Sequence, residues 1–415
     1  MGSSAGQPRL TVPEPGYRHG EPLSFDGLEF PGYPVAAGAV DKPPIDVEPD
    51  AIRKLAFSMV RVLDDEGNAR GPWAGTLTTD ELLTGLRHML LVRAFDARML
   101  RSQRQGKTSF YIQSLGEEAI ACAVRKALRD DDMNFPTYRQ QGLLIAQGCP
   151  LVSMINQIYS NRHDPVKGHQ LPVLYSFKEH GFFTLSGNLA TQFIQAVGWA
   201  MAAAIRGDDR VATGWIGDGA TAESDFHAAM VFASTYEPPV VLNIVNNQWA
   251  ISTFQGVARG GSATFAAKGL GFGIPSIRVD GNDYLAVHAV AQWAVERART
   301  GLGPTLIEWV TYRVGAHSTS DDPSAYRPSE EATAWPLGDP VNRLRDHLIK
   351  LGAWSPEQHD TAVTEADEKV RAAEAEAESW GTLRSDDAAS PADIFDDVYE
   401  TLPPHLRRQR QQLGY

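Results

Sequence analysis

One segment, residues 211–247, constrains the fold more than any other part of the chain. The apolar run 211–216 ends at Gly217-Asp218-Gly219, a helix-like segment follows, and a second apolar run, 240–245, ends at Asn246-Asn247. This order predicts a strand–helix–strand unit whose right-handed crossover makes the two strands parallel. Both strands would then end on the same side of an open α/β sheet, the side on which such sheets bind ligands.

The residues at the two predicted strand ends suit a metal-bound diphosphate. Asp218 and Asn247 lie 29 positions apart and would bring one carboxylate and one amide oxygen together. Mg²⁺ takes such oxygen ligands when it also holds the phosphates of a substrate. Gly217 and Gly219 would let the backbone approach those phosphates, and a helix starting near Thr221 would offer N–H groups to an anion. The segment therefore predicts a magnesium–diphosphate site.

A dinucleotide-binding turn is the main alternative at this position. Residues 217–222 also match the pattern G-x-G-x-x-A after a strand, although such a match is weak by itself. A dinucleotide site needs an acidic residue at the end of the second strand to bind the ribose. This strand ends in two asparagines, and Glu237 lies before it. An ordinary tight turn, the other alternative, needs only the glycines and explains neither Asp218 nor Asn247.

The rest of the chain extends this unit into a larger α/β domain. A capping box at Thr78–Glu81 predicts a helix that continues to about Gly106. The other expected elements are a strand-like piece and then a helix within 109–128, strands at 276–279 and 305–312 around a helix at 284–299, and helices at 355–379 and near 394–402. Because strands alternate with helices, the predicted core is a doubly wound α/β fold with a mostly parallel sheet.

The predicted division of the chain has three parts. Residues 1–75 form a proline-rich N-terminal arm. Residues 1–50 carry nine prolines, which exclude long helices, so we expect them to run extended, and residues 1–20 fit a disordered tail equally well. Residues 76–340 form the α/β domain, and residues 341–415 form a C-terminal helical extension.

Charge and cysteine content limit the expected partners and location. The net charge of −13, with no long basic block, argues against nucleic acid and against an anionic membrane surface. No apolar run reaches the ~20 residues that a membrane span needs, and no apolar secretion signal is evident near the start. Cys122 and Cys149 have no metal-type spacing, so we expect a reducing cytoplasm.

The motifs around the central segment resemble a known family. Gly-Asp-Gly followed about thirty residues later by Asn-Asn resembles the thiamine diphosphate signature, which by itself identifies only the cofactor. From about residue 50 onward the chain resembles the α subunit of the E1 component of 2-oxoacid dehydrogenase complexes, and most of all the branched-chain (2-oxoisovalerate) type. The motifs that carry this resemblance are SFYIQSLGEEA, FPTYRQQG, GNLATQ, GDGATAESDFH, NNQWAIST, VDGND and YRVGAHSTSDDPSAYR.

The resemblance implies a role for each matching residue. The implied ligands of Mg²⁺ are Asp218, Asn247 and, through its backbone carbonyl, Trp249. The implied cofactor-binding residues are Tyr138, Arg139, Leu189, Gly217, Gly219, Ala220, Asn247 and His317. The implied contacts of the substrate's acyl group are Phe110, Tyr138 and Leu189. A structural K⁺ site is implied at Ser186, Thr191 and Gln192.

His317 is the implied catalytic residue. In the family this histidine lies at the cofactor and assists the reaction of the 2-oxoacid, and the ordinary pKa of an imidazole suits proton donation near neutral pH. We expect Arg313 and Asp321 to order its loop through hydrogen bonds. Ser318 matches a phosphorylation site of mitochondrial relatives.

Two positions depart from the family pattern. Val245 stands where some relatives have an arginine that reaches the diphosphate, so we expect binding to rest more on Mg²⁺ and Arg139. Gly187-Asn188 replaces a more usual serine–proline pair in the loop of the implied K⁺ site.

The resemblance implies thiamine diphosphate-dependent oxidative decarboxylation of branched-chain 2-oxoacids such as 3-methyl-2-oxobutanoate. The acyl group would pass to the lipoyl group of an E2 acyltransferase, in the catabolism of valine, leucine and isoleucine. Enzymes of this kind activate the cofactor with a glutamate held by a second α/β domain, for which the helical residues after His317 leave no room. We therefore expect a β subunit and an α₂β₂ heterotetramer. The alternatives are a pyruvate or acetoin dehydrogenase α subunit, a non-catalytic assembly subunit and a dinucleotide-dependent dehydrogenase.

Overall fold

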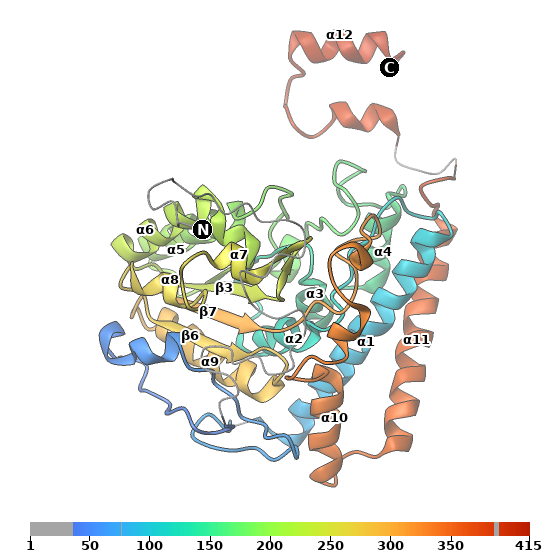
Figure 1. Ribbon diagram of the computed structural model, residues 1–415. Helices are drawn as coiled ribbons and strands as arrows, with labels where there is room; N and C mark the ends of the chain where they lie inside the picture. The colour runs from blue at the N-terminus through green and yellow to red at the C-terminus, as the bar shows by residue number, and fades with distance from the viewer. Residues whose placement is uncertain (1–35, 76, 386–389) are drawn as a thin grey trace, which may run out of the picture.

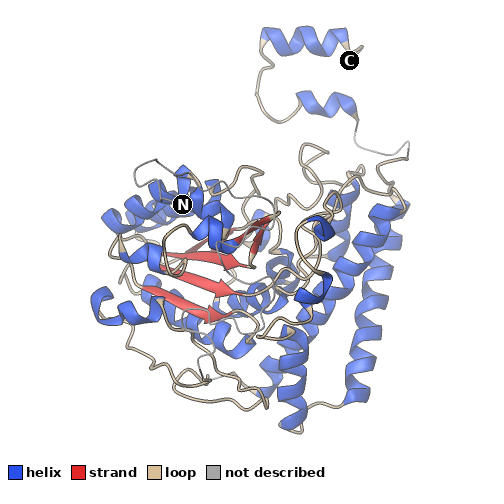
Figure 2. Ribbon diagram, in the orientation of Figure 1, coloured by secondary structure: helices blue, strands red, loops and turns tan. Residues whose placement is uncertain are grey.

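A five-stranded, all-parallel sheet forms the centre of the computed structural model, which describes residues 36–75, 77–385 and 390–415 (Figures 1 and 2). In spatial order its strands are β1 (Met133–Phe135), β2 (Ala212–Gly217), β3 (Val240–Asn246), β7 (Thr305–Val310) and β6 (Ser276–Asp280). The four strands expected from the sequence in the region 211–312 are confirmed. The parallel crossover from β2 to β3 is confirmed as well.

Helices cover both faces of this sheet, so its strands are apolar on both sides. Successive side chains of a strand point to opposite faces. Val241 and Val245 of β3 face one core, whereas Val240, Leu242 and Ile244 face the other. The helices on the first core include α1 (Thr79–Arg104), α2 (Glu118–Ala127), α9 (Tyr284–Arg299) and α11 (Pro356–Ser379). The helices on the second core include α5 (Thr191–Ile205) and α6 (Ser224–Tyr236). The doubly wound α/β fold is therefore confirmed.

The remaining elements are shorter and lie between or after these layers. The helices are α3 (Gln141–Gln147), α4 (Leu151–Tyr159), α7 (Gln255–Arg259), α8 (Ala267–Leu270), α10 (Pro340–Lys350) and α12 (Pro404–Gln412). The 3₁₀ turns are η1 (Pro49–Ala56), η2 (Lys178–His180), η3 (Gly219–Ala222), η4 (Pro323–Ala325), η5 (Ser329–Ala332) and η6 (Pro391–Phe395). A small antiparallel pair joins β4 (Trp249–Ala250) to β5 (Thr253–Phe254). None of the helices in the described residues is long and apolar enough to cross a membrane.

The predicted start of α1 is confirmed in detail. The Thr78 hydroxyl accepts a hydrogen bond from the Glu81 backbone N–H, and the Glu81 carboxylate accepts one from the Thr78 N–H. At its other end α1 packs against α11, where the buried Glu374 carboxylate accepts hydrogen bonds from Ser102 (2.6 Å) and Tyr159 (2.8 Å). The C-terminal region thus closes over the first core.

Two predicted elements are wrong. The strand-like piece expected at the start of residues 109–128 has no regular secondary structure and pairs with no strand of the described residues. The helix expected near 394–402 is replaced by η6 and, after a non-helical stretch, by α12, which contains the basic tail. Pro404 is the first residue of α12, because proline fits the first turn of a helix and not its interior.

The N-terminal region differs in part from the extended arm that we expected. Residues 1–35 lie outside the described residues, and η1 is a helical turn rather than extended chain. Further on, Val60 pairs in parallel with Val279 of β6, with a Val60 N–H to Arg278 carbonyl distance of 2.9 Å. This segment therefore continues the sheet at its β6 edge.

Candidate active site

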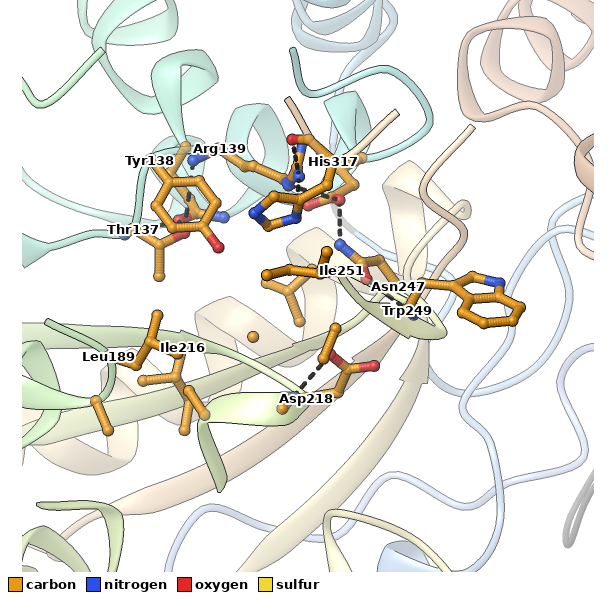
Figure 3. Close-up of a pocket in the computed structure, with 18 of the residues that line it drawn as sticks. Thr137, Tyr138, Arg139, Leu189, Ile216, Asp218, Asn247, Trp249, Ile251 and His317 are labelled. Atoms are coloured by element: carbon orange, nitrogen blue, oxygen red, sulfur yellow. Dashed lines mark hydrogen bonds and ion pairs between the residues drawn. The ribbon is translucent and has the colours of Figure 1, made fainter. Parts of the chain in front are cut away.

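A cavity of about 480 Å³ opens where β2 and β3 end, at the edge of the sheet predicted to bind a ligand (Figure 3). Eleven of the predicted site residues line it: Tyr138, Arg139, Leu189, Gln192, Gly217, Asp218, Gly219, Ala220, Asn247, Trp249 and His317. Phe110, Ser186 and Thr191 do not line it. Segments that are far apart in the sequence thus meet at one place.

Asp218 has a carboxylate oxygen without a hydrogen-bond partner among the described residues. Its Oδ1 accepts a hydrogen bond from the Gly219 N–H at 2.8 Å, whereas its buried Oδ2 accepts none. Burial raises the pKa of Asp218 to about 7. A buried, unpartnered carboxylate oxygen is unfavourable unless a cation compensates it, so this position suits a metal ion.

Asn247 and Trp249 line the cavity together with Asp218. The Asn247 Nδ2 donates to Glu117 Oε1 at 2.6 Å, which leaves its Oδ1 on the other side of the amide. That Oδ1 has only a long contact, 3.3 Å, from the Trp249 N–H. The Trp249 carbonyl accepts a hydrogen bond from Arg313 at 3.0 Å and keeps a second lone pair.

The backbone around Trp249 is held in an uncommon conformation. Gln248 and Ile251 have φ angles of 75° and 54°, in the left-handed region that β-branched residues such as isoleucine rarely adopt. The Arg313 guanidinium, which is itself buried, donates to the carbonyls of both Trp249 and Ile251. Such conformations persist where surrounding contacts fix them, and they are frequent at functional sites.

Arg139 and His317 form the opposite wall of the cavity. Arg139 donates to the His317 carbonyl at 2.6 Å, and its Nη2 lies 3.1 Å from His317 Nδ1. Because a guanidinium has no acceptor, Nδ1 must be the unprotonated nitrogen of the ring and Nε2 carries the proton. The Tyr138 ring packs edge-on against the imidazole, with the ring centres 5.8 Å apart.

The pKa of His317 is far from the near-neutral value expected. Burial, followed by the positive charges of Arg139 and Arg313, lowers the pKa of His317 to about 3. Each of these effects disfavours the imidazolium. His317 is therefore a neutral hydrogen-bond donor at physiological pH in this structure.

Comparison with known proteins assigns the chain to a family. A family model described as dehydrogenase E1 component matches residues 86–385, which include the whole sheet and every residue that lines the cavity. The chain belongs to this family. Dehydrogenase E1 components use thiamine diphosphate, so the interpretation of the Gly-Asp-Gly and Asn-Asn motifs as a cofactor signature is confirmed at this level.

Several relatives are named as alpha subunits of 2-oxoisovalerate dehydrogenase. The chain is 61% identical to the protein of that name from Pseudomonas aeruginosa over 406 residues, which is 98% of each chain. It is 40% identical to the mitochondrial protein of Mus musculus over 395 residues, 95% of this chain and 87% of the relative. It is 39% identical to subunit alpha 1 of Arabidopsis thaliana over 357 residues, 85% of this chain and 74% of the relative.

The donor set of this E1 cavity fits a metal-bound diphosphate. Asp218 supplies an uncompensated carboxylate oxygen, while Asn247 and Trp249 supply neutral oxygens.

A side chain at position 219 would clash, because a Cβ there would lie 2.4 Å from Ala250 Cβ. A Cβ at Gly217 would meet no atom within 4 Å, so the backbone at this cavity-lining position stays open to a ligand. The helix expected to start near Thr221 starts later. The turn η3 follows Asp218, and α6 begins only at Ser224.

The loop that carries His317 in this E1 chain is fixed by a chain of hydrogen bonds. Asp321 Oδ2 accepts from the His317 N–H and from the Tyr326 hydroxyl, both at 2.6 Å. Tyr326 in turn accepts from Arg313, and Arg327 donates to the Val314 and Gly315 carbonyls. Arg313 and Asp321 thus make the ordering contacts that we expected of them.

The loop of the implied K⁺ site satisfies part of its own hydrogen bonding. The Asn188 N–H donates to Ser186 Oγ at 3.1 Å, and Thr191 Oγ1 donates to the Asn188 carbonyl at 3.0 Å. Leu189, between them, is 45% exposed and lies at the cavity. The K⁺ site itself stays a prediction.

Several lining residues were not identified from the sequence. They are Glu117, Thr137, Gln140, Ala190, Ile216, Ala250 and Ile251, of which only Glu117 is ionisable. Glu117 lies in the motif SFYIQSLGEEA, but nothing in that motif indicates that its carboxylate meets Asn247, 130 positions further on.

Proposed function

We propose that this chain is the α subunit of a 2-oxoisovalerate dehydrogenase, the E1 component of a branched-chain 2-oxoacid dehydrogenase complex. It catalyses, with its partner subunit, the oxidative decarboxylation of branched-chain 2-oxoacids and the transfer of the acyl group to a lipoyl group. The observation that carries this proposal is the 61% identity over 98% of the chain to a protein of that name. The cavity at the ends of β2 and β3 supports it, because eleven of the residues that the resemblance implies for the site line it.

Asp218, Asn247 and the Trp249 carbonyl would hold Mg²⁺ in this function. Support comes from the unpartnered Oδ2 of Asp218 and from the amide of Asn247, whose oxygen is turned away from Glu117. When bound, thiamine diphosphate supplies a thiazolium ring that accepts the electrons released as carbon dioxide leaves. A K⁺ ion in the loop of Ser186 and Thr191 belongs to the same proposal.

Arg139 and His317 would act on the negatively charged groups in the cavity. The Arg139 guanidinium lies on the cavity wall, where its positive charge would attract the oxygens of a diphosphate. His317 carries its proton on Nε2, so it can donate a hydrogen bond to the carboxylate of a 2-oxoacid without being charged.

The acyl group of the substrate would lie against apolar residues at the mouth of the cavity. Leu189 and Ile251 line the cavity and are about half exposed, 45% and 53%. Phe110 instead packs against the first core, so its proposed contact with the acyl group requires that the pocket extend beyond the cavity of this chain. Side chains of a second subunit at this mouth would complete such a pocket.

The proposed partners are a β subunit, in an α₂β₂ heterotetramer, and a lipoyl-bearing E2 acyltransferase. The relatives are named as alpha subunits, which supports a second chain as the source of the activating glutamate. The proposed location is the cytoplasm, consistent with two buried free thiols, Cys122 and Cys149. The division at residues 75 and 340 remains our proposal for the domain boundaries.

Reconstitution tests the substrate and the reaction. The chain is co-expressed with the β subunit, supplied with thiamine diphosphate and Mg²⁺, and assayed for decarboxylation with an artificial electron acceptor. We expect 3-methyl-2-oxobutanoate to react faster than pyruvate. A faster reaction of pyruvate would instead assign the chain to the pyruvate or acetoin enzymes. Reduction of NAD without thiamine diphosphate would overturn the proposal as a whole.

Calorimetry tests the metal ligand. Asp218→Ala should lose binding of Mg²⁺ with thiamine diphosphate, because it removes the carboxylate oxygen that we assign to the metal, and the other carboxylate that lines the cavity, Glu117, faces Asn247 instead. Glu223→Ala is the matched control, since this exposed acid belongs to the same sequence motif but does not line the cavity. Normal affinity of Asp218→Ala would contradict the assignment.

A further inference from the structure

Glu117 is a buried acidic residue on the cavity wall to which the proposed mechanism gives no role. It precedes the first residue of α2 and is 3% exposed. Its backbone N–H donates to the Ser114 carbonyl at 2.8 Å, so the main chain at this point is fixed. A carboxyl group in such a place is unfavourable unless its contacts compensate for burial.

The contacts of Glu117 are two residues that the proposed function places at the cofactor. Its Oε1 accepts a hydrogen bond from Asn247 Nδ2 at 2.6 Å and lies 3.9 Å from Arg139 Nε. Its Oε2 is buried and has no hydrogen-bond partner in the described part of the chain. Because Oε1 faces two donors, it acts as an acceptor whether or not Oε2 holds a proton.

This contact decides which end of the Asn247 amide faces the metal position. An asparagine amide can turn by half a rotation and exchange its oxygen and nitrogen, and only the oxygen can bind Mg²⁺. The hydrogen bond to Glu117 keeps Nδ2 on the α2 side and leaves Oδ1 on the other. On that other side the Trp249 N–H, at 3.3 Å, is too distant to fix the amide strongly.

The Glu117 carboxylate also attracts the guanidinium of Arg139. The two terminal nitrogens of the Arg139 guanidinium donate to backbone carbonyls, Nη1 to that of Gln113 and Nη2 to that of His317. The third nitrogen, Nε, faces Glu117. Both side chains are almost fully buried, which makes the attraction between them stronger than at a surface. Glu117 thus links a metal ligand to a diphosphate-binding residue.

We propose that Glu117 is a positioning residue of the cofactor site, which orients the Asn247 amide so that its oxygen faces Mg²⁺ and steadies Arg139 beside it. This inference rests on the proposed function, because that function assigns Asn247 to the metal. Glu117 acts through its neighbours and touches neither metal nor substrate. Residues that orient a metal ligand affect metal affinity by about 10- to 100-fold when replaced.

Binding of Mg²⁺ to the assembled α–β enzyme, followed by calorimetry at saturating thiamine diphosphate, tests the inference. Glu117→Met keeps the length of the side chain but has no carboxylate to accept a hydrogen bond, so its Mg²⁺ dissociation constant should rise at least about tenfold. Glu117→Gln keeps an acceptor oxygen for Asn247, so its affinity should stay within about threefold of the wild type.

Glu118→Gln is the matched control. Glu118 is the next residue and is equally buried, but its carboxylate pairs with Arg93 at 2.9 Å and accepts from the Gly116 N–H, and it does not line the cavity. This control should lose thermal stability, because a buried ion pair is broken, and keep its Mg²⁺ affinity within about threefold.

Three results would overturn the inference. One is wild-type affinity in Glu117→Met, and another is an equal loss in Glu118→Gln, which would trace the effect to the packing of α2. If Glu117→Met does not assemble, Glu117→Asp replaces it. The aspartate side chain is shorter by one methylene, so its carboxylate should not reach Asn247. Wild-type Mg²⁺ affinity in Glu117→Asp is the third result that would overturn the inference. Failure of the wild-type enzyme to bind Mg²⁺ and thiamine diphosphate would overturn the proposed function itself.

Discussion

Asp218→Asn should make the metal-free enzyme more stable than the wild type, and the difference in their free energies of unfolding should grow as the pH rises. The carboxyl group is fully buried, its Oδ2 has no hydrogen-bond partner among the described residues, and burial raises its pKa from 3.8 to about 7. Between these two values the unfolded chain has released the proton while the folded chain still holds it. Raising the pH through this window therefore favours unfolding of the wild type, and an asparagine has no proton to release.

The size of this effect follows from the change in pKa. One pKa unit corresponds to about 1.4 kcal/mol. At pH 5 the wild-type carboxyl already costs between about 1 and 2 kcal/mol of folding free energy, and at pH 8 it costs about 4 kcal/mol. The stability of Asp218→Asn relative to the wild type should therefore grow by about 3 kcal/mol between pH 5 and pH 8. The comparison between two pH values removes any effect of the substitution that does not depend on ionisation.

Urea denaturation of the assembled enzyme, freed of Mg²⁺ and thiamine diphosphate by a chelator, measures this difference. Glu223→Gln, at an exposed position of the same motif, should keep the pH dependence of the wild type. Adding Mg²⁺ and thiamine diphosphate at pH 8 should stabilise the wild type and not Asp218→Asn, because ligand binding to the folded state adds to its stability. Parallel pH curves for the wild type and Asp218→Asn would refute the reasoning from burial.

Three further predictions concern other parts of the molecule. Thr78→Ala should lower the free energy of unfolding by about 1 kcal/mol, measured with urea, without changing the dissociation constant of thiamine diphosphate, because it removes only the cap of α1. Gly219→Ala should weaken thiamine diphosphate binding in calorimetry, since its Cβ would lie 2.4 Å from Ala250 Cβ; unchanged affinity would show that the turn adapts. A plot of kcat/KM against pH should show no inflection near 6.5, because the pKa of His317 is about 3; such an inflection would mean that the imidazole titrates.

The parts of the fold that the sequence predicts well are those with strong local signals. β2 and β3 are long apolar runs that end at Gly217 and Asn246, and α1 begins at a capping box. β1 is missed because a strand of three residues has no periodicity to detect. The helix expected near 394–402 is wrong because η6 ends at Phe395 and the next helix, α12, begins only at Pro404, where proline fits the first turn.

For the candidate site, residue types were predictable and their environments were not. The spacing of Asp218 and Asn247 brought them to one edge of the sheet, since parallel strands end together. The role of Glu117 depends on a contact across 130 positions. The low pKa of His317 depends in part on Arg139, 178 positions away. No local pattern encodes such distances, because the tertiary fold creates them.

The guanidinium of Arg313 joins two strands at the point where the hydrogen bonds of the sheet stop. Arg313 follows β7, and the two carbonyls that it binds, those of Trp249 and Ile251, follow β3. The backbone beside the proposed metal position is therefore ordered as soon as the chain has folded. The conformational entropy of this segment is lost when the chain folds. Binding of the cofactor therefore does not have to order the segment, and the binding free energy does not include that entropic cost.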